Sequence, residues 1–118
     1  MTLEEAVYTV DWIERLYWRK KDDEARKDLI KLWAVIFVDY EAEVVKYAVT
    51  QFIKHDRNGY PPMPGQVMGE IEKLEDELSF TNRILKQNGR KKTTLAHIVR
   101  SKLKDEHRRY LPKGEGYD

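Results

Sequence analysis

Apolar residues recur at intervals of three and four through most of the chain, the spacing that places side chains on one face of an α-helix. No segment shows the strict alternation of a half-buried β-strand. We therefore expect an all-α fold, a small helical bundle of about four helices followed by a basic C-terminal helical or flexible tail. The expected helices cover about residues 2–18, 24–37, 64–87 and 95–110, with a further one between Asp39, its expected cap, and Asn58–Gly59.

Turn and cap signals divide these helices. Thr2 and Glu5 form a T-x-x-E capping box that opens the first helix. Tyr60–Pro62 cannot be ordinary helix, because each proline biases the residue before it towards extended conformations. Pro64 suits the first position of a helix, where a missing amide hydrogen costs nothing. Asn88–Gly89 is a strong stop, since both residues tolerate left-handed dihedral angles.

The expected helix over residues 64–87 carries a near-heptad apolar stripe. The stripe has two interpretations: it faces the core of a monomer, or it forms a coiled-coil seam between subunits of a homo-oligomer. At about three heptads it is short for an independent coiled coil. Its members are Val67, Ile71, Leu74, Leu78, Thr81 and Leu85.

Length and composition limit the class of protein. A chain of 118 residues predicts one domain. The absence of cysteine excludes disulfides, thiolate metal sites and cysteine nucleophiles. No apolar run approaches the roughly 18 residues of a membrane span. The opening sequence MTLEEAV is acidic and lacks the basic region of a signal peptide, so we expect a cytoplasmic protein.

The net charge of +1 hides a division of the chain into an acidic body and a basic end. Residues 1–80 contain 11 Lys and Arg against 17 Asp and Glu, a net charge of −6. Residues 81–118 contain 11 Lys and Arg against 4 Asp and Glu, a net charge of +7. Either the basic end binds a negatively charged partner, or it folds over the acidic body of its own chain.

Residues that would indicate catalysis or cofactor binding are missing. Neither of the glycine-rich motifs that cradle nucleotide phosphates is present. His97 and His107 are ten residues apart, too far for a helical metal pair. The carboxylates occur in runs, which are usually solvated on the polar faces of helices rather than desolvated in a cleft. We therefore expect no catalytic, metal or cofactor site, and no enzyme.

The last expected helix presents a narrow apolar ridge at Leu95, Ile98, Val99 and Leu103, flanked by basic residues. Three interpretations stand. The helix can dock into a groove of a partner protein, with its arginines bonding acidic residues around it. Its basic residues can instead follow the phosphates of DNA with a salt-dependent affinity. The third interpretation is that the ridge packs on the core of its own domain.

Taken in order, the motifs of residues 3–75 resemble the phage family of loaders and inhibitors of DnaB-type replicative helicases. The resemblance rests on the order and spacing of these motifs rather than on any one of them. They are Leu16–Tyr17 at the end of the first helix, then Leu32–Trp33, Asp39–Glu41 opening a helix with Ala48 and Phe52–Ile53, and Tyr60–Pro62 followed by Val67.

The resemblance implies a helical domain, residues 1–88, followed by a basic partner-binding segment, residues 89–118. It implies binding to a hexameric DnaB-type helicase in the cytoplasm of a bacterial host, with loading of that helicase or inhibition of its ATPase until delivery to the origin. It also implies an origin-binding replication protein as second partner. The expected apolar contacts with the helicase are Ile84, Leu85, Leu95, Ile98, Val99 and Leu103, and the charged ones are Arg100, Arg108 and Arg109.

Overall fold

In the part of the chain that the structure describes, five helices form close to where the apolar periodicity predicts them. The computed structural model describes residues 1–19, 21–56 and 58–110, and for residues 108–110 it describes the backbone alone. Within these residues no strand forms. The all-α prediction is therefore confirmed, whereas residues 111–118 of the predicted basic tail, residues 89–118, lie outside the described residues. The helices are α1 (Leu3–Tyr17), α2 (Asp23–Ile36), α3 (Ala42–His55), α4 (Pro64–Gln87) and α5 (Leu95–Tyr110).

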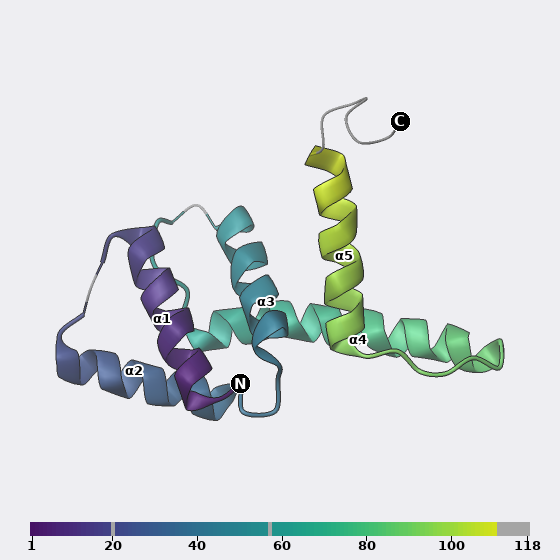
Figure 1. Ribbon diagram of the computed structural model, residues 1–118, viewed down its shortest axis with the longest axis horizontal. Helices are drawn as coiled ribbons and strands as arrows, with labels where there is room; N and C mark the ends of the chain where they lie inside the picture. Colours follow the sequence, from purple (N-terminus) through teal and green to yellow (C-terminus); the bar gives the residue numbers. More distant parts are fainter. Residues whose placement is uncertain (20, 57, 111–118) are drawn as a thin grey trace.

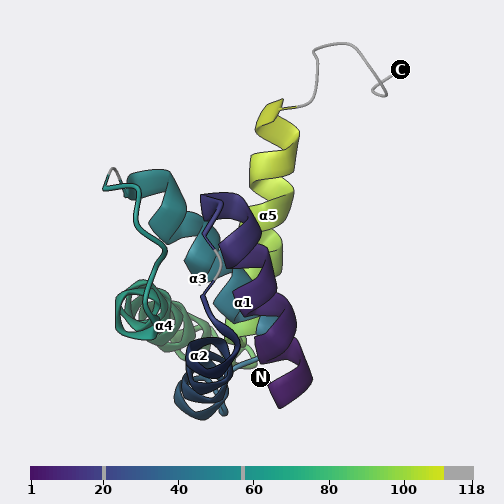
Figure 2. The same ribbon diagram turned by 90° about the vertical axis from the view of Figure 1, so that its left-hand side faces the viewer.

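The helices form a body with two projections (Figure 1). α1 packs against α2, α3 packs across the first half of α4, and α5 stands upright against both α3 and α4. The far half of α4 and the outer half of α5 extend beyond this body, as Figure 2 also shows for α5. The radius of gyration is 16.8 Å, larger than the about 13.5 Å of a compact domain of this length. The projecting helices therefore expose surface that a compact bundle would bury.

The core forms where the apolar stripes of α1 to α4 meet, and Val99 of α5 joins the same cluster. Trp33 and Phe37 are at most 1% exposed, and their ring centroids lie 5.3 Å apart in a tilted pair. Val45 from α3 and Ile71 from α4 are fully buried in the same apolar cluster. Burying such side chains stabilises the fold by about 1.5 to 3 kcal/mol each, which is why α1 to α4 form one packed unit.

The helix starts follow the predicted cap at α1 and depart from the prediction at α3. Asp22 caps α2 by accepting the Ala25 amide at 2.8 Å. The expected cap of α3, Asp39, is wrong: α3 starts later, at Ala42. The backbone amide of Tyr40 donates to the carbonyl of Phe37 at 3.0 Å. Because this turn includes Asp39, α3 can begin only after the turn has ended.

The capping box of α1 predicts a measurable contribution to stability. The Glu5 amide donates to the Thr2 hydroxyl at 3.1 Å, and the Thr2 amide donates to the Glu5 carboxylate at 2.9 Å. We expect Thr2→Ala to lower the free energy of unfolding by about 1 kcal/mol in urea titrations at neutral pH. The control is Ser79→Ala, an exposed site inside α4, which should be neutral or slightly stabilising. Equal effects of the two substitutions would contradict the cap.

The apolar stripe of α4 is used within its own chain. Val67 and Ile71 are fully buried and Leu74 is 6% exposed, all in the core. Farther along, Thr81 and Leu85 line a cleft between α4 and α5. A coiled coil between subunits along this stripe would therefore have to displace α3 and α5.

The apolar ridge of α5, expected to contact the helicase, packs largely on the body of its own chain instead. Val99 is fully buried in the core cluster, Ile98 is 8% exposed, and Leu95 is half-buried against the same cluster. The physical reason is that α3 and α4 alone leave an apolar surface uncovered, and the ridge of α5 covers it. Of the three interpretations of this helix, packing on its own core describes the inner side of α5.

Candidate partner-binding surface

The structure separates the predicted contact residues by accessibility. Ile98 and Val99 are buried, and Leu85 and Leu95 are half-buried. None of these four offers an open surface to a partner while α5 stays packed. The exposed members are Ile84 on α4, at 42%, and Leu103 on the outer half of α5, at 47%, together with Arg100. The side chains of Arg108 and Arg109 lie outside the described residues.

Part of the basic charge of α5 binds the acidic body of its own chain. Arg100 donates to both carboxylate oxygens of Glu43 on α3, at 2.6 and 3.0 Å. Lys102 lies 3.1 Å from a carboxylate oxygen of Glu77 on α4. The Arg100 guanidinium lowers the pKa of the Glu43 carboxyl below its ordinary value, and Glu43 in turn raises the pKa of Arg100. At these residues the basic end of the chain therefore binds the acidic body of the same chain.

The Arg100–Glu43 pair predicts a pH-dependent stability. Because the pKa of Glu43 is lower in the folded chain, its stabilising effect is present above the unfolded pKa and is lost as pH falls through the folded pKa. We expect Arg100→Gln to lower the melting temperature at neutral pH, and this difference from the unmodified chain to vanish in acid. The control is Lys104→Gln, an exposed cation of α5 with no ion pair among the described residues. A difference independent of pH would contradict the assignment.

A cluster of unpaired cations lies at the far end of α4 and in the connection to α5. Within the described part of the chain, none of the exposed cations there forms an ion pair. These cations therefore remain available to an external partner. They are Arg83, Lys86, Arg90, Lys91 and Lys92.

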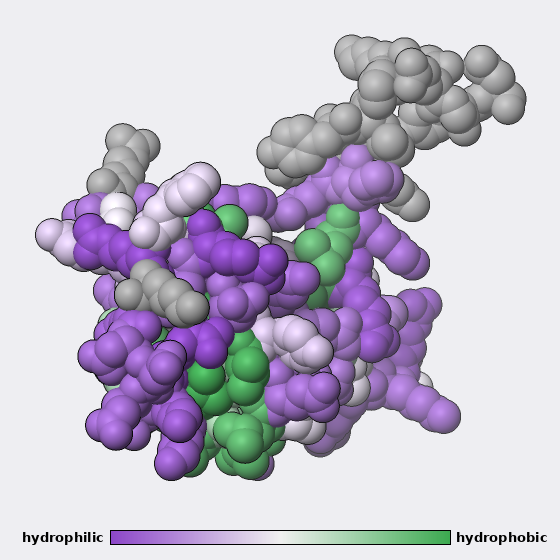
Figure 3. All heavy atoms as spheres, turned by 60° about the vertical axis from the view of Figure 1, so that its left-hand side comes forward, coloured by the Kyte–Doolittle hydropathy of each residue, from purple (hydrophilic) through white to green (hydrophobic). Residues whose placement is uncertain are grey.

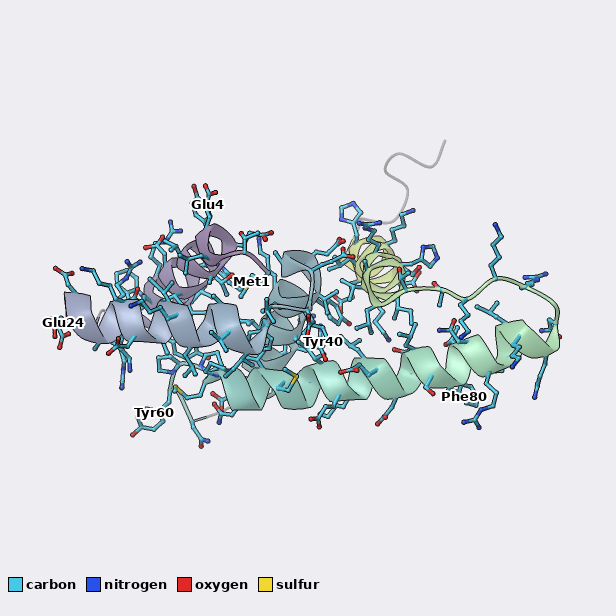
Figure 4. All side chains as sticks on the ribbon, turned by 90° about the horizontal axis from the view of Figure 1, so that it is seen from below. Met1, Glu4, Glu24, Tyr40, Tyr60 and Phe80 are labelled. Carbon is cyan, nitrogen blue, oxygen red and sulfur yellow. The ribbon has the colours of Figure 1, made fainter. Side chains whose placement is uncertain are left out.

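An exposed apolar pair accompanies these cations. Phe80 is 60% exposed and Ile84 is 42% exposed, and a spacing of four residues places them side by side on α4. Figure 4 shows Phe80 extending from the projecting half of α4, on the side turned away from α5. We call this surface the α4 tip, defined as Phe80, Arg83, Ile84, Lys86 and Arg90–Lys92.

Phe80 is the contact candidate that the sequence analysis missed. The near-heptad stripe assigned the neighbouring Thr81 to the apolar face. The available signal was the spacing of four between Phe80 and Ile84, which defines a second face of the same helix. That face carries no buried member, so it is a surface feature rather than part of the core.

Two sets of hydrogen bonds, one within the backbone and one from a side chain, fix the α4 tip in place. At the end of α4 the Arg90 amide donates to the Leu85 carbonyl at 2.8 Å, and the Gly89 amide donates to the Lys86 carbonyl at 3.1 Å. This is a Schellman motif, and Gly89 has the positive φ of 69° that it requires. The Asn82 side chain accepts the Thr93 amide at 2.7 Å and donates to the Thr93 carbonyl. The basic connection is thereby tied back along α4.

A second exposed apolar area lies on the α1–α2 side of the molecule. In Figure 3 apolar side chains gather low on this face, with hydrophilic side chains around them. This area provides matched control substitutions for the α4 tip. The exposed large aliphatic side chains of α1 and α2 are Leu3, Val7, Leu16, Leu32 and Val35.

The described residues offer surfaces for binding, but they contain no cluster of side chains that could hold a metal ion. Among them, no three His, Asp or Glu side chains are grouped to hold a metal ion. No described helix is long and apolar enough to cross a membrane. Exposed apolar side chains framed by unpaired cations are instead typical of contacts with a macromolecule. Fold and site together define a small all-α protein with surfaces suited to macromolecular binding.

A comparison with protein families assigns the chain to a family within this class. The family model for the N-terminal domain of the phage gene 39 protein matches residues 1–68, more than half of the chain. The chain belongs to this family, that of a DnaB helicase inhibitor and loader. The comparisons with curated proteins and with solved structures gave no match. The resemblance seen in the sequence is thus confirmed, and the matched region covers α1 to α3 and the start of α4.

Proposed function

We propose that this chain is a non-enzymatic DNA replication protein that binds a hexameric DnaB-type helicase. In this proposal it loads the helicase, or restrains its ATPase until delivery to the origin, with an origin-binding replication protein as second partner. Membership of a helicase-associated phage family supports the proposal. The chain would act by binding alone, shifting the helicase between states that it binds with different affinity.

We propose the α4 tip as the surface that contacts the helicase, because its apolar side chains are exposed. Phe80 and Ile84 offer apolar area that is already exposed, so that binding need not first detach a packed helix. Aromatic and arginine side chains dominate the binding energy of many protein interfaces, and Phe80 and Arg83 are of these kinds. The cations of the connection, Arg90–Lys92, belong to the same surface, whereas the exposed Leu103 lies apart from it on α5. The buried Ile98 and Val99 are left out of this proposed contact.

We also propose a functional division of the chain into a helical domain, residues 1–88, and a basic partner-binding segment, residues 89–118. α5 packs on α3 and α4, so the proposed boundary does not separate two folding units. The α4 tip spans the boundary, since Phe80 and Ile84 lie before it and Arg90–Lys92 after it, and Val99 of the basic segment belongs to the core.

The test is direct binding to the cognate helicase. The full chain and the helicase hexamer are mixed with ATP and passed over a size-exclusion column, and the ATPase rate is measured across a titration. We expect co-elution and a change in ATPase rate that saturates with the added chain. Separate elution together with an unchanged rate would refute the proposed function.

DNA binding is the second candidate function, favoured by the five unpaired cations of the α4 tip. If all five contact phosphates, affinity for DNA should fall roughly 500-fold between 50 and 200 mM salt. Fluorescence anisotropy with labelled duplex and single-stranded DNA measures this dependence. Negligible DNA affinity at low salt would leave the helicase as the partner of this surface.

A further inference from the structure

A groove lies far from the α4 tip, between the α1–α2 pair and the segment that leads into α4. Its volume is about 600 Å³. The side chains on one side belong to the edge of the core, and the opposite wall is the Tyr60–Met63 segment. Figure 4 shows Tyr60 at the outer edge, beside the start of α4. The core-side residues are Val10, Ile13, Leu29 and Trp33.

The rim of this groove carries positive charge that nothing in the described chain neutralises. Arg19 and Lys21 border the groove, and neither side chain forms an ion pair among the described residues. The one carboxylate in the lining, Glu14, is already bound: the Arg26 guanidinium donates to one oxygen at 2.6 Å, and the Lys21 backbone amide donates to the other at 3.2 Å. The groove therefore favours an occupant that brings negative charge.

The walls are suited to holding a protein segment. The Arg19 guanidinium lies 5.1 Å from the centroid of the Tyr60 ring, and Tyr60 is still 63% exposed. Trp18, next to Arg19 in sequence and outside the lining of the groove, is 94% exposed in a left-handed conformation with φ of 56°. Trp, Tyr and Arg are the residue types that contribute most to protein interfaces. Pro61 and Pro62 stiffen the wall, which lowers the entropy cost of binding.

We propose that this groove binds a segment of a partner protein in which a bulky apolar side chain is flanked by carboxylates. The apolar side chain enters the groove between Leu29 and the proline wall, and the carboxylates meet Arg19 and Lys21. Within the described residues, no buried side-chain nitrogen or oxygen lacks a hydrogen-bond partner. The groove thus holds no free buried polar group to orient a small polar ligand, which favours a peptide as the occupant.

Selection of short random peptides displayed on a surface tests this proposal with the full chain as bait. We expect enrichment of peptides with a bulky apolar residue and neighbouring Asp or Glu. A labelled synthetic peptide of the enriched sequence should lose about tenfold in affinity on Tyr60→Ala, measured by fluorescence anisotropy. The double variant Arg19→Glu and Lys21→Glu should select peptides with Lys or Arg in place of the acidic residues.

Matched controls separate the groove from the rest of the surface. Tyr8 is 66% exposed on α1, so Tyr8→Ala removes an equally exposed tyrosine and should leave peptide affinity unchanged. Lys31→Glu reverses an exposed cation of α2 outside the groove and should leave the selected sequences unchanged. Thermal melting of each variant checks that the fold is intact.

Several results would overturn the groove proposal. They are the absence of any enriched peptide, enriched peptides without acidic residues, and affinity lost equally on Tyr8→Ala and Tyr60→Ala. Sedimentation that detects a dimer abolished by Tyr60→Ala would assign the groove to a second copy of the chain, which also overturns it. No helicase takes part in these measurements, so their failure leaves the α4 tip proposal standing.

Discussion

Replacing Val99 with Asp should lower the free energy of unfolding by about 4 kcal/mol or more, because the substitution places an unpaired carboxylate at a fully buried position. Val99 belongs to the same apolar cluster as Val45 and Val67, and the described part of α5 buries no other side chain as completely. A domain of ordinary stability has only about 5 to 15 kcal/mol in total. The substitution is therefore expected to detach α5 or to unfold the whole chain.

Urea titration followed by circular dichroism measures this loss. The control is Leu103→Asp on the same helix, where the side chain is 47% exposed and the carboxylate stays in water, so the loss should be below about 1 kcal/mol. If Val99→Asp and Leu103→Asp cost the same small amount, the packing of α5 on the body would be refuted. The interpretation of its ridge as a free partner surface would then hold instead.

The helices themselves follow from local signals in the sequence. Pro64 begins α4 and the Asn88–Gly89 stop ends it, at the positions that proline and glycine chemistry predicts. The capping box at Thr2 likewise marks the start of α1. Each of these signals acts over a few residues, and no tertiary contact is needed to interpret it. The predicted start of α3 is wrong because a turn ending at Tyr40 competes with the cap expected from Asp39.

The role of α5 could not be predicted in the same way. Leu95, Ile98, Val99 and Leu103 form the same pattern whether the ridge meets a partner or its own core. Periodicity identifies the apolar face of a helix, but it does not identify the surface that this face meets. That surface is built by α3 and α4, and it exists only once those helices have packed.

Net charge alone is equally ambiguous. The basic segment as a whole carries a surplus of positive charge, yet Arg100 and Lys102 form ion pairs with Glu43 and Glu77 of the same chain. The cations of the α4 tip have no such partners among the described residues. A sum over residues cannot distinguish these two groups, because the distinction depends on which acidic side chains the fold brings within reach.

The α4 tip leads to the second large expected effect. Replacing Phe80 and Ile84 together with Ala should weaken binding to the cognate DnaB-type helicase at least about 100-fold. Central apolar contacts of an interface often contribute about 2 kcal/mol each, and every 1.4 kcal/mol is tenfold in affinity. Both side chains are exposed, so the double variant should keep the melting temperature of the unmodified chain.

Isothermal titration calorimetry with the helicase hexamer measures the loss. Leu3→Ala with Val7→Ala is the matched control: it removes another exposed apolar pair with the same spacing of four, at 58% and 36% exposure on α1. The control should bind as the unmodified chain does. If it loses affinity while the Phe80 and Ile84 variant retains it, the helicase contacts the α1–α2 side of the molecule. The projecting half of α4 would then need another role, and its five unpaired cations would point to DNA.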